Sequence, residues 1–369
     1  MRKRLINTVL AALLVLALCL SGCTSGGTSG GTDTNDKQTA DNNADNTGNS
    51  AKDSQNSSDK QSDKTDDTAQ QETGKTEKND QSGEGSSSND NSGQTGDDTD
   101  SDSDEALVTK EGITGEYKKK DLKTTYNEAK ATSIVLNGNT AAITGTGAEA
   151  DGSTIRINTK GNYLISGSLN DGQIVINVGD DDDVRLILNG VDIRCSNSSC
   201  IYVINADKCI ITTTAGSVNT LSDGSNYTYA KPDKEEPNAA IFSDCDLSIN
   251  GEGTLDVTGN FGHAIRAKAD LKITSGTLYV SAADKGFKAK KTFSILDGNV
   301  TINAKKDGID AGSVINIDGG TLTITSGDDA VQSDEQIIIN DGTVDLSKCK
   351  KGMKAPVITT NGGNVLFAE

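Results

Sequence analysis

Hydrophobic residues recur at a fixed spacing through the C-terminal third of the chain. Ala264, Gly286, Gly308, Ala330 and Gly352 follow one another at intervals of 22 residues, and an apolar residue comes after each of them. In the first four intervals, two further pairs of apolar residues flank a glycine, and the members of each pair lie two positions apart. Apolar residues two apart are typical of a β-strand with one buried face. The pattern therefore predicts three short strands in each repeat, with glycine at a corner.

Repeats of this length predict a solenoid. One repeat cannot bury its apolar face alone, whereas stacked repeats bury a continuous core. Upstream of Ala240 the strand-like segments are spaced less evenly, and residues 222–239 have the polar composition of a loop. We predict an all-β fold, a single-stranded right-handed parallel β-helix with rungs of 22–24 residues that occupies residues 106–369. The residues from Ile113 to Ala131 are expected to form its N-terminal cap.

The N-terminus carries an export pattern. Three basic residues precede a short apolar run, which is the order of a secretory signal peptide and not of a membrane span. Residues 20–23 read Leu-Ser-Gly-Cys and resemble a bacterial lipobox. This resemblance implies a signal peptide over residues 1–22 and a lipid anchor on Cys23. The expected location is extracytoplasmic, at the cell surface, with the lipid held in the membrane.

A polar segment separates Cys23 from the predicted solenoid. Residues 24–105 contain no Val, Leu, Ile, Met or aromatic residue. Such a segment cannot bury enough apolar surface to offset the entropy of ordering it, so residues 23–105 are predicted to be a disordered linker. The segment holds 20 acidic residues against 6 lysines, and therefore most of the net charge of −19. The acidic balance argues against nucleic acid as a partner.

Five cysteines follow the linker, and export permits disulfides among them. Cys195 and Cys200 are close enough in sequence to staple a turn, and Cys209 and Cys245 are placed to link neighbouring rungs. The odd count leaves at least one thiol unpaired or intermolecular.

Acidic residues gather at two adjacent corners of the predicted solenoid. They are Asp307, Asp310, Asp328, Asp329 and Asp334. Because stacking places equivalent residues about 4.8 Å apart, several of these carboxylates are expected to converge. Ca²⁺ takes 6–8 oxygen ligands, so the group is a candidate calcium site. The alternative is an ion-pair ladder, since lysines alternate with acids at the same corner positions.

Basic and aromatic residues near these corners are candidates for sugar binding. Arg266, Lys285, Lys288 and Lys306 are placed to hold the carboxylates of an acidic polysaccharide, and Tyr279 offers an aromatic face. Outward positions after the turn glycine form rows of Thr, Ser and Asn. These rows suit a sugar-binding plane, but they are also what β-propensity gives on a solvated face.

Catalytic motifs are poorly represented, and no catalytic residue is predicted. His263 is the only histidine, so a Ser-His-Asp or Cys-His arrangement has little support. Paired aspartates serve glycoside hydrolysis, but acids on a regular ladder give no reason to choose one pair.

Three stretches resemble a family of exported bacterial carbohydrate-binding β-helix proteins. They are DGQIVINVGDDDDVRLILNGVDI, the segment from Asn219 to Asn260, and the serial corners, of which KKDGIDA from Lys305 to Ala311 is the most complete. The resemblance implies an architecture like that of pectate lyases, calcium, and plant-type polysaccharides such as cellulose and pectin. Lys285 and Lys351 stand where the family writes an acid, which leaves the five aspartates as the remaining cluster.

These observations lead to one preferred function. The chain is expected to be a cell-surface lipoprotein whose β-helix binds polysaccharide with the help of calcium and without catalysis. The alternatives are a calcium-dependent, pectate-type polysaccharide lyase and a structural or adhesion protein of the surface.

Overall fold

The computed structural model describes residues 104–229, 233 and 235–367. The predicted signal peptide, the predicted lipid anchor Cys23 and nearly all of the predicted linker lie outside these residues. Within them, no helix is long and apolar enough to cross a membrane.

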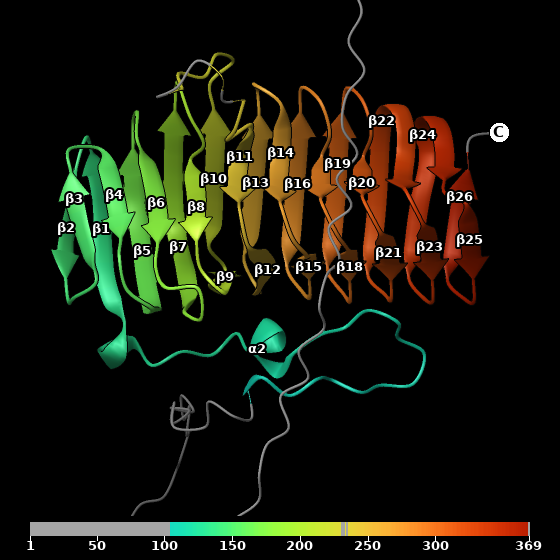
Figure 1. Ribbon diagram of the computed structural model, residues 1–369, viewed down its shortest axis with the longest axis horizontal. Helices are drawn as coiled ribbons and strands as arrows, with labels where there is room; N and C mark the ends of the chain where they lie inside the picture. The colour runs from blue at the N-terminus through green and yellow to red at the C-terminus, as the bar shows by residue number, and fades with distance from the viewer. Residues whose placement is uncertain (1–103, 230–232, 234, 368–369) are drawn as a thin grey trace, which may run out of the picture. The chain divides into compact units, whose positions relative to one another are not determined.

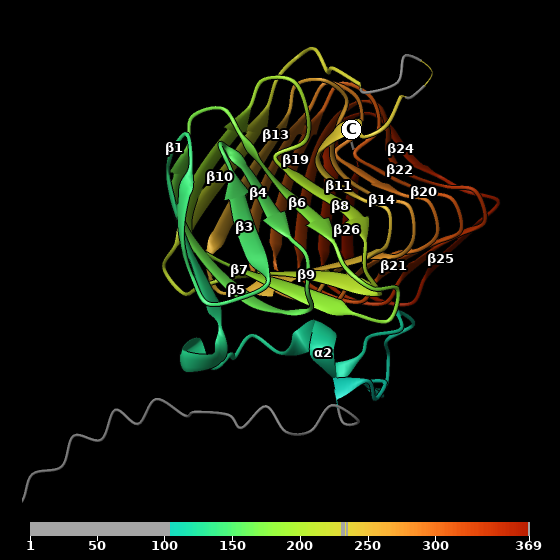
Figure 2. The ribbon, with the colours of Figure 1, turned by 60° about the vertical axis from the view of Figure 1, so that its left-hand side comes forward.

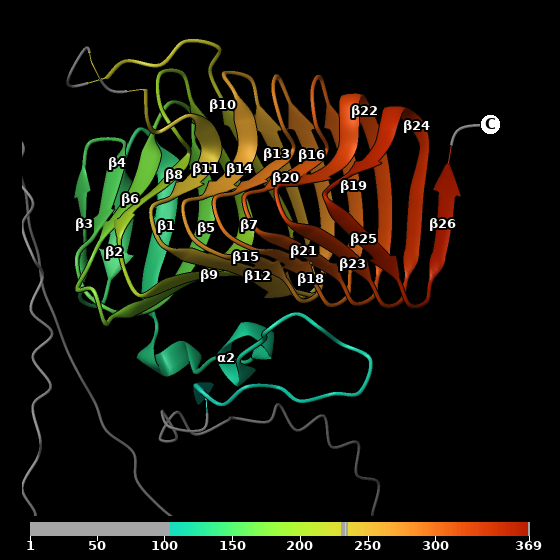
Figure 3. The ribbon, with the colours of Figure 1, turned by 45° about the vertical axis from the view of Figure 1, so that its right-hand side comes forward.

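Short parallel strands stack into three sheets around one core, as Figures 1 and 3 show, and this confirms the predicted parallel β-helix. We call the sheets A, B and C. Sheet A contains β1 (Thr132–Gly138), β10 (Val218–Asp223), β13 (Thr254–Gly259), β16 (Thr277–Ala282), β19 (Asn299–Ala304) and β26 (Asn364–Phe367). Sheet B contains β9 (Lys208–Thr213), β12 (Asp246–Gly251), β15 (Leu271–Ile273), β18 (Phe293–Ile295), β21 (Val314–Ile317), β23 (Gln336–Ile339) and β25 (Val357–Thr360). Sheet C contains β4 (Thr154–Ile157), β6 (Gln173–Asn177), β8 (Ile201–Asn205), β11 (Ala239–Ser243), β14 (His263–Ala267), β17 (Phe287–Ala289) and β20 (Ile309–Ala311).

Five of the described strands pass from one sheet to the next. One of them is β1, whose first three residues pair with the first half of β5. In β5 (Gly161–Leu169) and β7 (Asp183–Cys195), the first half lies with sheet B and the second half with sheet A. In β22 (Thr321–Ser333) and β24 (Thr343–Lys354), the first half lies with sheet A and the second half continues sheet C.

The 22-residue repeat sets the register of the C-terminal rungs, as the sequence predicted. In sheet C, Ile265 pairs with Phe287, Phe287 with Ile309, and Ile309 with Val331. These side chains face the core and are fully buried. The corner before sheet A needs glycine for two reasons. Gly320 has φ +81°, and a Cβ there would lie 2.7 Å from the carbonyl oxygen of Gly298.

The segment of residues 104–131 lies along the outward side of sheet B, and we call it the strap (Figure 2). It contains α2 (Lys119–Leu122) and the 3₁₀ helix η1 (Glu128–Lys130). The carboxylate of Asp121 accepts hydrogen bonds from Lys208 Nζ and Ser248 Oγ, each at 2.7 Å. Further along, Asp318 of the solenoid accepts hydrogen bonds from Gly115 N at 2.9 Å and Tyr117 Oη at 2.8 Å.

The predicted N-terminal cap is therefore wrong, because residues 113–131 belong to the strap. The first rungs end instead in two antiparallel pairs, formed by β2 (Ala141–Thr144) with β1 and by β3 (Ala148–Asp151) with β4. The physical reason is that the outward side of sheet B carries polar groups that need partners, and the strap supplies them.

The five cysteines of the described residues are free thiols, and three of them are buried. Neither of the pairings considered from the sequence, Cys195 with Cys200 or Cys209 with Cys245, is formed in the structure.

Candidate functional site

Three of the five predicted metal ligands lie together at the corner between sheets A and C. Asp307 precedes β20, and Asp328 and Asp329 lie in β22 one rung further on. Carboxylate oxygens of these three residues lie within 4.8 Å of one another. Asp307 Oδ1 also accepts a hydrogen bond from the backbone N–H of Asp329 at 3.1 Å. Stacking of the 22-residue repeat thus brings three of the five predicted acids together.

Lysines from neighbouring rungs reach the same three carboxylates. Lys285 Nζ lies 3.0 Å from Asp307 Oδ2, and Lys354 Nζ lies 3.5 Å from Asp329 Oδ2. Lys351 pairs with Asp328, which is partly exposed, while Asp307 and Asp329 are buried. The corner is therefore a mixed cluster in which basic side chains balance part of the negative charge.

The other two predicted ligands are placed differently. Asp310 is buried under Lys285 and Lys288, and Lys288 Nζ lies 2.7 Å from its Oδ1. Burial alone would raise the pKa of Asp310, but the two lysines outweigh burial and hold this pKa below its usual value. Asp334 is exposed, and it is not part of the group of converging oxygens.

The predicted sugar-binding residues also separate. Arg266 donates hydrogen bonds to Asn238 Oδ1 and Glu236 Oε1, each at 2.7 Å. Lys306 is exposed and pairs with Asp284 at 3.1 Å. Tyr279 is 48 % exposed on the outward side of sheet A. Of the predicted set, only Arg266 and Lys288 occupy equivalent positions on sheet C, where they are direct neighbours.

These two residues belong to a longer row of register-paired positions on the outward side of sheet C, which we call the sheet C row. The row consists of Arg156, Val175, Tyr202, Phe242, Arg266, Lys288, Asp310, Gln332 and Lys354. It combines aromatic, basic and amide groups along most of the solenoid. From Arg266 onward, the constant spacing of 22 residues allows the row to be predicted from the sequence. The rungs before Arg266 have unequal lengths, so the position of Tyr202 in the row could not be predicted.

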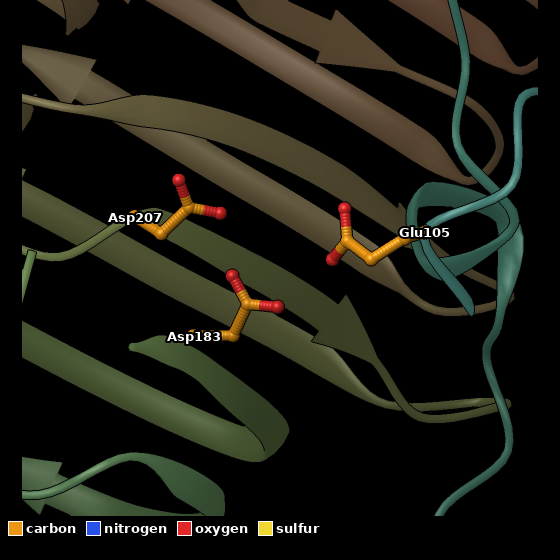
Figure 4. Close-up of side chains that lie close together, drawn as sticks. All are labelled: Glu105, Asp183 and Asp207. Carbon is orange, nitrogen blue, oxygen red and sulfur yellow. The ribbon is translucent and has the colours of Figure 1, made fainter. Parts of the chain in front are cut away.

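A second acidic group, which was not predicted from the sequence, lies between the strap and the solenoid. Figure 4 shows the carboxylates of Glu105, Asp183 and Asp207 turned toward one another. The buried Lys120 Nζ lies 2.8 Å from Asp183 and 3.3 Å from Asp207, and it also contacts Glu105. Burial opposes the charge of Lys120, but its hydrogen bonds to Asp183 and Glu105 outweigh burial and raise its pKa. The group therefore holds an internal cation and fastens the strap.

The single histidine is withdrawn from the surface. His263 is 8 % exposed at the start of β14, and its Nδ1 lies 3.7 Å from Asp284. Burial lowers the pKa of His263 to about 4, so the imidazole is neutral at physiological pH.

Comparison with known proteins identifies the family. A family model described as carbohydrate-binding domain-containing protein matches residues 151–364. The chain belongs to this family. The matched range contains every position of the sheet C row and excludes the strap.

Two further similarities agree with the family. A carbohydrate-binding domain-containing protein of Acetivibrio thermocellus is 39 % identical over 128 residues, which are 35 % of this chain and 45 % of that protein. The chain thus spans less than half of that relative's length. A solved structure, described as the polysaccharide lyase-like protein from C. thermocellum, gadolinium derivative, is 30 % identical with a TM-score of 0.52. The similarity covers 64 % of this chain and 96 % of the other.

Proposed function

We propose that this carbohydrate-binding protein holds a polysaccharide along the outward side of sheet C and does not cleave it. The sheet C row is the observation that carries the proposal. Strands in a sheet repeat about every 4.8 Å, so the members of the row that reach solvent lie at multiples of this step, which suits a polymer of repeating units. They include Arg156, Tyr202, Gln332 and Lys354, whereas Val175, Phe242 and Asp310 are buried. The Tyr, Arg, Lys and Gln side chains of the row supply the aromatic faces and hydrogen-bonding groups that sugars need.

The other two sheets are less suitable. The strap covers much of the outward side of sheet B and uses its polar groups. The outward side of sheet A carries mainly Thr, Asn and Ser between β16 and β19, with Tyr279 as an isolated aromatic residue. Within the described residues, sheet C combines basic and aromatic side chains in one register.

Cleavage by a lyase mechanism needs a basic residue free to take a proton from the sugar. Arg266 donates to Glu236 and Asn238, and its guanidinium carbon lies 5.3 Å from the centre of the Phe242 ring. Lys285 and Lys288 are held by Asp310 and Asp307. These contacts favour binding over elimination.

Calcium at the corner of Asp307, Asp328 and Asp329 is a second part of the proposal. The donor set fits a hard cation, because three carboxylates converge and Asp328 leaves one side open to solvent. The lysines beside Asp328 and Asp329 are more than half exposed. The pair of Lys351 with Asp328 is exposed on both sides. Exposed pairs contribute only about 0–1 kcal/mol, so a cation can displace this one. Asp329 and Asp307 are buried and keep Lys354 and Lys285 beside them. Asp310 and Asp334 are not part of this revised ligand set.

Thermal melting in calcium and in chelator tests this part. An ion that binds the folded form alone raises the melting temperature as its concentration rises. The rise should occur in the wild type and in Asp334→Asn, and should vanish in Asp307→Ala with Asp329→Ala. Equal melting curves for the wild type in calcium and in chelator would refute calcium binding.

The location is proposed on the sequence pattern. A lipid on Cys23 would hold the chain at the membrane, and residues 23–105 would extend the solenoid away from it. Membrane fractionation of cells that express the wild type or Cys23→Ser provides the test. The wild type should sediment with membranes and the variant should not; equal distribution would contradict the anchor.

Binding and cleavage are separated by co-sedimentation of the full chain with insoluble polysaccharides, followed by an assay for new chain ends. Binding without new ends is expected. The double variant Gln332→Ala with Lys354→Ala, at the exposed end of the sheet C row, should bind several-fold more weakly. Thr301→Ala with Thr323→Ala, a matched pair on sheet A, should bind as the wild type does. Failure of the wild type to bind any polysaccharide, or new unsaturated ends, would overturn the proposal.

A further inference from the structure

A cleft of about 460 Å³ opens along the N-terminal half of sheet C. One wall consists of outward side chains from β4, β6 and β8, namely Arg156, Gln173, Val175, Tyr202 and Ile204. The facing wall includes Thr228, Tyr229, Glu236 and Pro237, which lie between β10 and β11 in the sequence. Ligand-binding clefts commonly have volumes of about 300–1,000 Å³ and combine apolar walls with a few fixed polar groups. The cleft has both the size and this composition.

Its two tyrosines are held in place. The Tyr202 ring meets Phe242 edge-on, with centroids 5.6 Å apart and an angle of 79° between the planes. Phe242 is fully buried, so Tyr202 has a firm support. The Tyr229 hydroxyl donates a hydrogen bond to the carbonyl oxygen of Pro237 at 3.0 Å. Because little side-chain freedom remains to be lost, aromatic faces fixed in this way bind a flat apolar surface efficiently.

The charges that line the cleft balance one another. Lys268 Nζ lies 2.8 Å from Glu236 Oε2 and 2.8 Å from Asp244 Oδ1. Arg156 lies toward the other end, and its guanidinium is 3.7 Å from Asp151. Two basic and two acidic side chains of the lining therefore cancel, so a charged ligand would bring an uncompensated charge into the cleft.

One polar group of the lining lacks a partner. Gln173 Oε1 is buried and accepts no hydrogen bond from the described residues. A buried acceptor without a partner is unfavourable by roughly 1–3 kcal/mol, which a donor from a ligand would relieve.

We infer that this cleft is the subsite that recognises a neutral pyranose unit of the polysaccharide. The apolar face of the sugar ring lies on Tyr202, with Tyr229 on the opposite side. Its hydroxyl groups donate to Gln173 and to the carboxylates around Lys268, and they accept from Arg156. This inference rests on the proposed function and adds the place, the ring-stacking residue and the neutral character of the bound sugar.

Calorimetric titration of the full chain with cellohexaose, a neutral probe, and with hexagalacturonate, an acidic probe, tests the inference. Truncation of a central aromatic contact typically weakens binding about tenfold or more. Tyr202→Ala and Tyr229→Ala should therefore weaken cellohexaose binding about tenfold. Tyr202→Phe keeps the ring and its support on Phe242, so it should bind within about threefold of the wild type.

Tyr126→Ala is the matched control, because Tyr126 is a half-buried tyrosine on the strap and remote from the cleft lining. Its affinity should equal that of the wild type, and melting curves of all variants verify folding. Wild-type affinity in Tyr202→Ala would overturn the inference while leaving the proposed function intact. Binding of hexagalacturonate in preference to cellohexaose would overturn the neutral subsite. Absence of binding to every polysaccharide would overturn the proposed function and this inference with it.

Discussion

Replacement of Asp121 by asparagine should strongly destabilise the folded chain. The side chain of Asp121 is fully buried between the strap and sheet B, and it pairs with Lys208, which is 1 % exposed. Asparagine keeps the shape but removes the negative charge. Lys208 then stays buried with no carboxylate partner among the described residues, and the nearby Lys272 loses one of the acids that act on it. Loss of one partner of a buried pair costs about 3–5 kcal/mol.

The effect should be visible by thermal melting. For a domain of this size, 1 kcal/mol corresponds to a shift of about 2–4 °C, so a fall of the melting temperature by roughly 10 °C is expected. The matched control is Asp104→Asn, which removes an acid of the strap from a partly exposed pair with Lys123. This control should shift the melting temperature by no more than about 3 °C.

A second substitution identifies the cause. When Lys208→Met is added to Asp121→Asn, the buried charge that lost its partner is removed, so much of the stability should return. A melting temperature for Asp121→Asn within about 3 °C of the wild type would refute the claim that Asp121 fixes the strap. The same conclusion would follow if the double variant were less stable than Asp121→Asn.

The dependence of stability on acidic pH tests the role of Asp121 independently. Burial alone would raise the pKa of Asp121, but the charge of Lys208 and its hydrogen bond outweigh burial and lower the pKa. The stabilisation is therefore complete above the pKa of an unfolded aspartate, about 3.9, and is lost as pH falls through the lower folded value. Below this range, the wild type and Asp121→Asn should converge in stability.

Three other predictions concern separate parts of the molecule. Burial raises the pKa of Asp223 to about 6, so its contribution to stability is complete below about pH 4 and is lost as pH rises through 6. Asp223→Asn should therefore reduce the fall of the free energy of unfolding, measured in urea, between about pH 4 and pH 6. An unchanged fall would contradict this prediction. Phe287 is fully buried, and its ring centroid lies 5.3 Å from that of Phe293. Phe287→Ala should therefore lower the free energy of unfolding by about 3–5 kcal/mol. A loss below about 1 kcal/mol would show that this rung is poorly packed. Polygalacturonate incubated with the full chain and calcium should give no unsaturated product by ultraviolet absorbance; product formation that Arg266→Ala abolishes would favour the lyase.

The strand register of the C-terminal half of the solenoid could be predicted because its rungs have a constant length in the sequence. Ile265, Phe287 and Ile309 recur every 22 residues and pair directly in sheet C. The same spacing predicted that Asp307 and Asp329 would meet, and Asp329 N–H does donate to Asp307. What spacing alone does not predict is the direction of each lysine, which is decided by the nearest carboxylate. Lys285 and Lys288 therefore both turn toward Asp310.

The strap and the cleft could not be predicted in the same way. Asp121 meets Lys208 across 87 residues and Ser248 across 127 residues, and no repeat relates these positions. Tyr202 lies in the sheet C row, but the loop between β10 and β11 separates it in sequence from Phe242. Contacts between segments that are separated by irregular distances in the sequence follow no repeating pattern. They can therefore be identified only in the folded structure.

A crystal structure of the full chain with cellohexaose would show directly whether polysaccharide lies along sheet C. Sugar rings are expected along the sheet C row, with one ring over Tyr202 and beside Arg156. Sugar bound to the outward side of sheet A, around Tyr279 and Thr301, with the sheet C row bare, would contradict this expectation.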